Sequence, residues 1–455
     1  MTDTPLHTPA PQPVDADQPW WRTLIAFRRN VIATWPPAAY DARVRVGGFL
    51  GRRWLLLNDP DGIRRVLIDN PDNYRRTRAT VRILRPIIGR GLFLSDGEDW
   101  RRQRRTLAPA FAPRVVPVLA RHVATVAADA VARLAGRAGA PVDLYAEMQR
   151  VALEIAARSM FSLEMDRDGA LLRDRLTRYA QHLGRPYLLD LLLPTAIPTW
   201  HDVARWVFKL RWMRLIDRVM ARRAAAPALE SVEPRDLFDL LVAARDPAGG
   251  AAFTRAQLRD QLATLLVAGH ETTAVALFWS LYLLARAPAE QQRLADEAAG
   301  CALAPERAFD ALARLPYARA VVSEALRLYP PAFTIVREAI ADDRAGDVVI
   351  PARTVVMIAP WVLHRHRALW REPERFDPTR FLPDAPPPER FAYLPFGAGP
   401  RVCIGAQFAL TEATLTLAAL VKAFRITLAP GPPVTPVAIV TTRPDHAPSF
   451  RLEKR

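Results

Sequence analysis

Apolar residues recur every three to four positions along most of the chain between about Pro60 and Tyr329, a spacing that predicts amphipathic helices. The longest continuous pattern runs over Thr254–Arg286 and ends before Pro288. At 1.5 Å per residue this helix would be about 50 Å long. A last helix is expected over Ala406–Phe424.

Alternating patterns are short and few. Arg43–Val46 and Trp54–Leu57 flank Gly47-Gly48 and predict a hairpin that turns at the two glycines. Asp347–Ala359 is a second strand-rich stretch, and Pro373–Pro400 is proline-rich without periodicity, which predicts an extended meander. The pattern as a whole predicts a mostly α fold with small β-sheets.

The beginning of the chain differs from the remainder. Residues 1–19 are rich in proline and lack apolar periodicity, so we expect a disordered tail. Trp20–Trp35 predicts an amphipathic helix, which we expect to pack on its own domain rather than on a membrane surface. No linker-like segment follows, so residues 20–455 are expected to form a single domain.

Composition excludes several classes of protein. Half of the 455 residues are hydrophobic and 24% are charged, which permits a large core. No apolar run approaches the roughly 18 residues of a spanning helix, and no signal peptide is visible, so we expect a cytoplasmic protein without a transmembrane anchor. Cys301 and Cys403 are too few for a disulfide framework or a structural zinc site.

The net charge of +16 invites comparison with nucleic-acid-binding proteins. Of the 63 basic residues only three are lysines, and the arginines are scattered along the chain without a recognisable nucleic-acid module. We therefore favour a solvated, arginine-rich surface and expect no nucleic-acid partner. One local cluster, Arg101, Arg102, Arg104 and Arg105, lies within a predicted helix.

The candidate chemistry centres on Cys403, which lies between Gly399 and Gly405 just before a predicted helix. Glycines there let backbone amides approach the sulfur, and a helix N-terminus favours the thiolate. No second cysteine or histidine is nearby to complete a zinc site. The residues alone are compatible with a catalytic nucleophile or with an axial ligand of a haem iron.

The segment Phe396–Gly405 resembles the haem-ligand loop of the cytochrome P450 monooxygenases, F-x-x-G-x-R-x-C-x-G, at every fixed position. The resemblance implies that Cys403 is the proximal thiolate of the haem iron. It also implies that Arg401 pairs with a haem propionate and that Phe396 packs near the thiolate. Gly399 and Gly405 would complete this cofactor-binding loop.

Ala268-Gly269-His270-Glu271-Thr272-Thr273, inside the long predicted helix, resembles the oxygen-binding motif of the same family. Helical spacing places Ala268, Gly269 and Thr272 on one small, apolar face. The resemblance implies that this face crosses the haem, that Thr272 hydrogen-bonds dioxygen and that Glu271 supplies protons. Without the haem loop, a hydroxyl bonded back to a helix carbonyl would be the preferred interpretation of Thr272.

Glu324 and Arg327 are three residues apart on one helical turn and would form only a weak pair at a surface. In the P450 family an E-x-x-R pair is buried and joined by a second arginine from the meander. Arg375 and Arg380 are both candidates, and the surrounding pattern favours Arg380. The resemblance implies a structural triad without a chemical role.

Trp100 and Arg104 share a helical face and resemble the family's W-x-x-x-R helix, which contacts a haem propionate. Arg337 lies where many relatives place another propionate arginine. Arg101, Arg102 and Arg105 are expected to point elsewhere, either toward an acidic electron donor or into solvent.

The resemblance implies the triangular P450 fold, non-covalent haem b and O₂ as co-substrate. Because no flavin or iron–sulfur module is visible, electrons from NAD(P)H are expected through a separate ferredoxin or flavodoxin with its reductase. We expect a monomer that oxidises an apolar small molecule. Two alternatives are a peroxide-driven haem-thiolate enzyme and a non-enzymatic haem sensor; the Glu271-Thr272 pair argues against both.

The predicted substrate pocket is largely apolar. It is expected to draw on five regions, Arg78–Leu94, Leu183–Trp200, Leu262–Ala276, Ala332–Val336 and Pro436–Val440. Such a pocket favours a fatty acid, terpenoid, steroid-like or aromatic substrate. A substrate carboxylate would have four candidate partners, although each could equally face water: Arg78, Arg82, Arg85 and Arg185.

Overall fold

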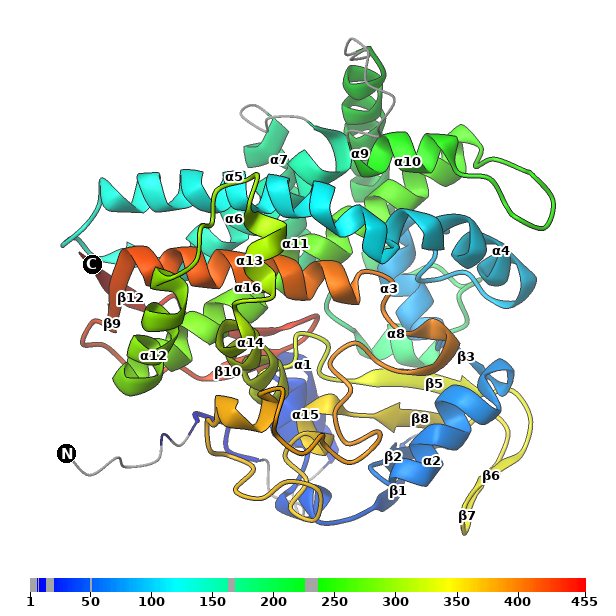
Figure 1. Ribbon diagram of the computed structural model, residues 1–455. Helices are drawn as coiled ribbons and strands as arrows, with labels where there is room; N and C mark the ends of the chain where they lie inside the picture. Colours follow the sequence, from blue (N-terminus) through cyan, green and yellow to red (C-terminus); the bar gives the residue numbers. More distant parts are fainter. Residues whose placement is uncertain (1–5, 7, 14–19, 50, 163–167, 226–235) are drawn as a thin grey trace.

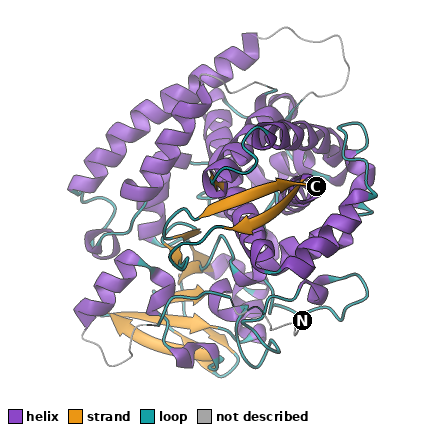
Figure 2. Cartoon of the chain, turned by 90° about the vertical axis from the view of Figure 1, so that its left-hand side faces the viewer, coloured by secondary structure: helices purple, strands orange, loops and turns teal. Residues whose placement is uncertain are grey.

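The computed structural model describes residues 6, 8–13, 20–49, 51–162, 168–225 and 236–455. Helices make up most of these residues, and the strands gather mainly in one corner of the molecule (Figure 2). The helices are α1 (Trp20–Arg29), α2 (Pro60–Arg64), α3 (Arg78–Ile88), α4 (Gly97–Leu107), α5 (Val116–Ala135), α6 (Leu144–Phe161), α7 (Asp168–Arg178), α8 (Leu188–Leu192), α9 (Trp200–Ala225), α10 (Leu237–Ala243), α11 (Arg255–Arg286), α12 (Pro288–Ala299), α13 (Ala308–Leu312), α14 (Pro316–Leu328), α15 (Pro360–Leu363) and α16 (Ala406–Ala423). The prediction of a mostly α fold with small sheets is confirmed.

The strands form four small sheets (Figure 1). They are β1 (Val44–Phe49), β2 (Arg52–Leu57), β3 (Tyr74–Arg75), β4 (Val142–Asp143), β5 (Ile335–Ala339), β6 (Asp343–Ala345), β7 (Val348–Ile350), β8 (Val355–Ile358), β9 (Phe424–Leu428), β10 (Pro436–Ala438), β11 (Thr442–Pro444) and β12 (Ser449–Lys454). The largest has the order β1-β2-β8-β5-β3, with β2 and β8 parallel and the other neighbours antiparallel. The others are β4-β12-β9, β10-β11 and β6-β7.

Helix α11 is the central element of the helical body. Thr254 caps its N-terminus in a reciprocal box with Gln257, and the helix ends before Pro288, as its sequence pattern predicts. It packs against α6, α16, α14, α3 and α9. Its second half is buried almost all round, because it passes between these helices.

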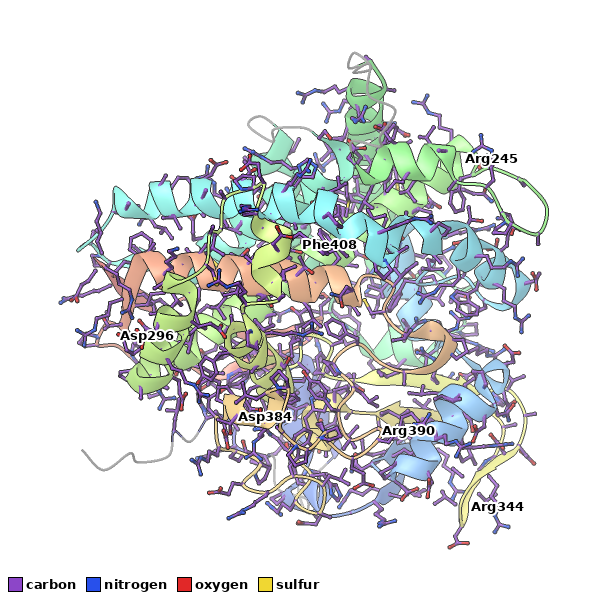
Figure 3. The ribbon with its side chains drawn as sticks, viewed as in Figure 1. Arg245, Asp296, Arg344, Asp384, Arg390 and Phe408 are labelled. Atoms are coloured by element: carbon purple, nitrogen blue, oxygen red, sulfur yellow. The ribbon has the colours of Figure 1, made fainter. Side chains whose placement is uncertain are left out.

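The hydrophobic core extends on both sides of α11. Figure 3 shows the side chains over the whole fold: Arg245 and Arg344 project from the outside, whereas Phe408 on α16 lies among the helices. α5 and α11 are long and apolar enough to cross a membrane by length and composition, with mean hydropathies of 1.5 and 1.3. Half and 72%, respectively, of their apolar windows are buried inside the protein, which is the environment of core helices.

The hairpin forms, but its turn does not lie at Gly47-Gly48. Both glycines are within β1, where Gly47 pairs with Trp54 and Gly48 with Arg53, and the strands connect beyond Phe49. A Cβ on Gly47 would come within 2.2 Å of the Trp54 indole. The glycine is therefore required for close packing of the ring, rather than for a turn.

Part of the N-terminal segment that was expected to be a disordered tail contacts the folded domain. The backbone N–H of Thr8 donates to Glu374 O at 3.2 Å, and the Tyr329 hydroxyl donates to Pro9 O at 3.0 Å. Thr8 is buried. Leu6 and Thr8 thus bond to the meander and Pro9 bonds to Tyr329, so hydrogen bonds to distant residues hold this segment in place of a local helix or strand.

Trp20–Trp35 is helical in two pieces. α1 ends at Arg29, and a short 3₁₀ turn over Val31–Thr34 follows. Val31, Ile32 and Trp35 are buried. The second piece therefore packs on the domain, whereas Trp21 and Ile25 of α1 remain 47% and 45% exposed.

Candidate active site

A cavity of about 1160 Å³ lies between α11, α3, the large sheet and the segment that ends in α16. Its lining is mainly apolar and comes from all five of the regions predicted from the sequence. It also draws on α1, on the β1–β2 hairpin and on Met357 of β8, which the sequence did not indicate. Among the described residues, no group of three or more histidines, cysteines or acids is placed to hold a metal ion by itself.

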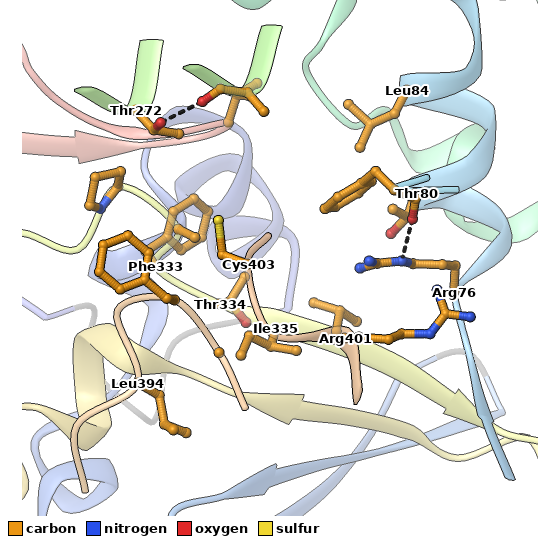
Figure 4. A pocket seen from close by; sticks show the side chains of 18 of the residues that line it. Arg76, Thr80, Leu84, Thr272, Phe333, Thr334, Ile335, Leu394, Arg401 and Cys403 are labelled. Atoms are coloured by element: carbon orange, nitrogen blue, oxygen red, sulfur yellow. Dashed lines mark hydrogen bonds between the residues drawn. The ribbon is translucent and has the colours of Figure 1, made fainter. Parts of the chain in front are cut away.

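Cys403 lies on the floor of this cavity, and Figure 4 shows its sulfur directed into the space below Thr272. Its backbone N–H donates to Phe396 O at 2.9 Å, which closes the loop. Gly399 has φ of 72°, and a Cβ there would come within 2.0 Å of the Leu67 carbonyl oxygen. Only glycine can occupy that position, because a side chain would force the loop away from the preceding helix.

The pKa of the Cys403 thiol is raised, because burial disfavours the charged sulfur. A hydrogen bond from the Gly405 backbone and the charge of Arg104 act in the opposite direction. The hydrogen bond from Gly405 thus favours the thiolate, as expected of the glycine loop, but burial outweighs it in the protein alone. A cationic centre beside the sulfur is needed to hold the thiolate, as metal coordination provides.

Helix α11 supplies the opposite wall of the cavity. Leu265, Ala268, Gly269, Thr272 and Ala276 all line it, on the face predicted from their spacing. A Cβ added to Gly269 would meet no protein atom within 4 Å. Packing within the protein thus gives no reason for this glycine, whereas a flat group placed between α11 and Cys403 would.

Thr272 and Glu271 point in different directions. The Thr272 hydroxyl lines the cavity and donates to Ala268 O at 2.5 Å (Figure 4). Glu271 does not line the cavity and accepts a hydrogen bond from the Thr441 hydroxyl at 2.8 Å. Burial raises the pKa of Glu271, although Thr441 and Arg443 oppose the shift.

One end of the cavity carries an excess of positive charge. Arg76, Arg104, Arg337 and Arg401 line it together with Trp100. Asp96 pairs with Arg401 at 2.7 Å and is the only acid in the described part of the chain that pairs with any of the four. Arg401 also lies over the Trp100 ring, 4.5 Å from its centroid.

These cations repel one another. Burial, with repulsion from Arg401, lowers the pKa of Arg337 to about 10, and its guanidinium donates only to the carbonyl of Val336. The pKa of Arg76 is lowered by burial and by Arg337 and Arg401. Figure 4 shows Arg76 and Arg401 side by side at this end of the site. Such a cluster fits a ligand that carries two negative charges, like the propionates of haem.

Together these features pass a test for haem: a sulfur ligand on one wall, a helix without protruding side chains on the other, and unbalanced cations at one end. Trp100, Arg104, Arg337 and Arg401 were expected at the propionates, and the structure brings them together. Arg76 was missed, because no motif surrounds it and only the fold brings it to the cluster.

Glu324 and Arg327 lie outside the cavity and are fully buried. The five N–H groups of Arg327 donate to both carboxylate oxygens of Glu324, at 2.6 and 2.7 Å, and to three backbone carbonyls. Arg380 approaches Glu324 at 3.7 Å, whereas the side chain of Arg375 pairs with Glu372. The structure thus places Arg380, rather than Arg375, beside the pair.

Comparison with known proteins agrees with this geometry. The cytochrome P450 family model matches residues 44–445. The chain belongs to the cytochrome P450 family. Its enzymes are haem-thiolate oxidoreductases that use O₂, so this P450 is a monooxygenase-type enzyme with a haem cofactor.

Two curated relatives come from Streptomyces melanosporofaciens. Cyclooctatin synthase is 37% identical over 363 residues, which cover 77% of this chain and 76% of the relative. Cyclooctat-9-en-7-ol 5-monooxygenase is 31% identical over 443 residues, covering 93% and 94%. The crystal structure of the cytochrome P450DA heme domain has a TM-score of 0.81 at 26% identity and covers 99% of this chain and 98% of that one.

Glu412 on α16 is a further site residue of this P450 that the sequence analysis missed. It lines the cavity, is 3% exposed, and accepts from the Thr273 hydroxyl at 3.4 Å through one carboxylate oxygen. Its other oxygen has no hydrogen-bond partner among the described residues. Burial raises the pKa of this carboxyl well above the usual range of a glutamate, although the hydrogen bond from Thr273 opposes the shift. Glu412 is the only acid in the predicted helix Ala406–Phe424, and this was the available signal.

Proposed function

We propose that this P450 inserts one atom of O₂ into a largely apolar small molecule, with hydroxylation or epoxidation as the outcome. The overall reaction is R–H + O₂ + two electrons + two protons giving R–OH and water. One observation carries the proposal: Cys403 and Thr272 face each other across an apolar cavity with unbalanced arginines at one end. When bound there, haem b supplies the oxidation chemistry.

In this proposal the Cys403 sulfur would bind the haem iron, and Arg104, Arg337, Arg401 and Trp100 would hold the propionates. Arg76 adds a fourth cation to that end. Phe396 accepts from the Cys403 N–H and fixes the loop, while Ala268 and Gly269 leave room for the flat cofactor. Gly405 donates its backbone N–H to the sulfur, and Gly399 lets the loop approach Leu67 closely. Glu324, Arg327 and Arg380 keep the meander in place from outside the site.

Proton supply is assigned to Thr272 and Glu271. Thr272 places a hydroxyl at the cavity wall. The side chain of Glu271, the residue before it, points away from the cavity and bonds to Thr441. Because burial raises the pKa of Glu271, its carboxyl holds a proton closer to neutral pH than an exposed glutamate does. Helix α11 therefore presents a hydroxyl group, Thr272, toward the cavity and a carboxyl group that can supply protons, Glu271, on its other side.

The lining of the cavity supports an apolar substrate. Phe93, Phe333, Ile335, Leu84 and Leu191 contribute side chains. Of the four arginines considered for a substrate carboxylate, only Arg78 lines the cavity. The relative cyclooctat-9-en-7-ol 5-monooxygenase has a cyclic alcohol in its name, so we place a terpenoid first among the classes considered.

Electrons are proposed to come from NAD(P)H through a separate ferredoxin or flavodoxin with its reductase. Arg101 pairs with Asp72 at 2.6 Å, and Arg102 pairs with Asp99 at 3.1 Å. Arg105 is shared between Glu98 and Asp246. These acids offset the positive charge of Arg101, Arg102 and Arg105 on α4. We therefore propose that the electron donor docks elsewhere on the positively charged surface of the protein.

We further propose a cytoplasmic monomer with residues 20–455 as one domain. The cytoplasmic assignment is supported by Cys301 and Cys403, which are both free thiols, as is usual in a reducing compartment.

The first experiment is the absorption spectrum of the purified protein after reduction with dithionite and exposure to CO. A strongly red-shifted Soret band supports haem with a thiolate ligand, and Cys403→His should abolish it. Haem binding without the shift would overturn the assignment of Cys403. Folded protein that binds no haem would overturn the whole proposal.

A second experiment separates the monooxygenase from its alternatives. Product formation with NADH and surrogate redox proteins, but not with peroxide alone, supports the proposal. Thr272→Ala should lower product per NADH consumed and raise peroxide release, by roughly tenfold or more for loss of a proton-transfer group. Unchanged coupling would contradict the role of Thr272. Ser280→Ala is a matched control, because Ser280 lies on the same helix, donates to the Ala276 carbonyl and does not line the cavity.

A further inference from the structure

The outward face of α9 is apolar over its first half. Trp200 is 88% exposed, Trp206 59% and Val203 55%. Val207 and Leu210, at 37% and 36%, continue the same face at helical spacing. Large apolar side chains on a soluble surface are normally scattered, so five on one helix face form a patch that requires an explanation.

The second half of the same face is cationic. Arg211, Arg214 and Arg218 follow the apolar residues at intervals of three and four and are exposed. None of the three forms an ion pair with a described residue. Asp217 is the only acid between Val203 and Arg218, and it pairs with Arg259 of α11 at 3.4 Å. Within the described part of the chain, the charge of the three arginines is therefore unbalanced.

Helix α9 is firmly held on its inner side. Arg205 makes a buried pair with Asp190, with both N–O distances at 2.8 Å, and Trp212 is fully buried with its indole N–H on Ile87 O. Arg223 pairs with Asp236 at 2.8 Å near the other end. The outer face is thus presented by a rigid helix, about 39 Å long at 1.5 Å per residue.

Helix α1, which carries the apolar side chains Trp21 and Ile25, lies next to the N-terminal end of α9. The rings of Tyr187 and of His201 on α9 are stacked with 3.4 Å between their centroids, and the guanidinium of Arg28 on α1 lies 5.1 Å from the centroid of the Tyr187 ring. These contacts bring α1 next to α9. Trp21 and Ile25, four residues apart on α1, are about half exposed. The apolar surface therefore extends from α9 toward α1.

We propose that the outward face of α9 docks on an anionic lipid surface. The Trp200 half would enter the boundary between headgroups and acyl chains, where tryptophan is favoured, and the three arginines would meet phosphate groups. A second copy of this chain fits less well, because its identical face would bring more arginines and no free acid. A bilayer supplies both the apolar layer and the anionic layer that the two halves require.

This docking goes beyond the oxidation reaction and does not depend on it. It does place the cavity near the lipid, since Leu189 of α8 is 46% exposed while Leu191, two residues later, lines the cavity. Attachment would be reversible, because it relies on one helix face rather than on a spanning segment.

The test is cosedimentation of the haem-loaded full-length protein with vesicles. Vesicles of phosphatidylcholine with phosphatidylglycerol should bind it at least tenfold more tightly than phosphatidylcholine alone, and added salt should weaken the binding. Failure of the wild-type protein to bind anionic vesicles at low salt would overturn the proposal.

Paired variants locate the contact. Arg211→Gln/Arg214→Gln/Arg218→Gln should weaken binding roughly a hundredfold, at about fivefold per cation. Arg344→Gln/Arg353→Gln/Arg451→Gln removes the same charge from exposed sites elsewhere and should have a much smaller effect. Equal losses from the two triple variants would show that net charge, and not this face, attracts the vesicles.

Trp200→Ser/Trp206→Ser should weaken binding at least tenfold. Phe309→Ser/Ile340→Ser, at residues that are 46% and 49% exposed, should not. The reduced-CO spectrum and the thermal unfolding curve should be the same in all variants. Sedimentation velocity distinguishes the rival occupant: a dimer that Trp200→Ser/Trp206→Ser dissociates would make the face a contact between copies and overturn the lipid assignment.

Discussion

The arginine clusters around Arg327 and around Arg337 are both buried, but only the first is balanced within the protein. Arg327 has a carboxylate and three carbonyls for its five donors. Arg337, Arg104 and Arg76 have no carboxylate partner among the described residues, and burial lowers the pKa of each. Burial alone therefore does not separate a structural arginine from a ligand-binding one; the balance of charge around it does.

The largest effect is expected from Glu324→Gln, which leaves the charge of Arg327 unpaired in a fully buried site. Removing one partner of a buried ion pair costs about 3–5 kcal/mol, so the free energy of unfolding should fall by that amount. Denaturant titration of the haem-free protein measures it. Asp310→Asn, in an exposed pair with Arg307 at 3.9 Å, is the control and should change little. If Glu324→Gln lowered the free energy of unfolding by no more than the control does, the two arginine clusters would not differ in their charge balance.

The second cluster should respond in the opposite way. Arg337→Gln and Arg104→Gln should each weaken haem binding by about tenfold to a hundredfold, the value of a charge-assisted hydrogen bond. The same changes should leave the stability of the haem-free protein unchanged or raise it, because a repelling cation is removed. Haem titration and denaturation of Arg319→Gln, an exposed site on α14, provide the comparison. A loss of haem-free stability would mean that these arginines are structural too.

A smaller, pH-dependent effect is expected beside the first cluster. Burial lowers the pKa of His364 to about 3, and its ring bonds to Arg327 O and accepts from the Leu394 N–H. The unfolded histidine binds a proton near pH 6.5 and the folded one does not, so stability is complete above that pH and falls below it. The slope should be about 1.4 kcal/mol per pH unit for this one group.

The variant His364→Gln should lack this slope, so the difference in unfolding free energy between wild type and variant should itself depend on pH below about 6.5, as measured by denaturation at pH 7.5, 6.5 and 5.5. His446→Gln, at a partly exposed position, is the control. Parallel pH dependence of wild type and His364→Gln would contradict the assignment.

The smallest effect should distinguish Arg380 from Arg375. Arg380 is 3.7 Å from Glu324 and partly exposed, so Arg380→Gln should cost about 1 kcal/mol of unfolding free energy or less. Arg375→Gln should cost less still, since its side chain pairs with exposed Glu372, and its contact with Arg327 is made by the backbone. Denaturant titration with errors of a few tenths of a kcal/mol can rank the two.

Much of the helical body and the haem loop could be predicted, because both depend on residues close in sequence. The bounds of α11, the cavity-facing side of Gly269 and Thr272, and the loop around Cys403 follow from spacing and local motifs. Strand β5, before the predicted strand-rich stretch, was missed because Ile335–Ala339 pairs with β8 and β3 rather than within a hairpin. The contacts of Thr8 with Glu374 and of Pro9 with Tyr329 were missed because these partners are more than 300 residues apart in sequence.

By itself, the sequence determined the P450 family, the position of Cys403 before α16 and the helix that carries Thr272, since each depends on a short run of side chains with fixed spacing. The tertiary structure decided which charges are balanced. It brought Arg76 and Glu412 to the cavity, turned Glu271 toward Thr441 and left the outer face of α9 uncovered. Burial and electrostatic balance depend on residues that are hundreds of positions apart, and only the folded chain brings them together.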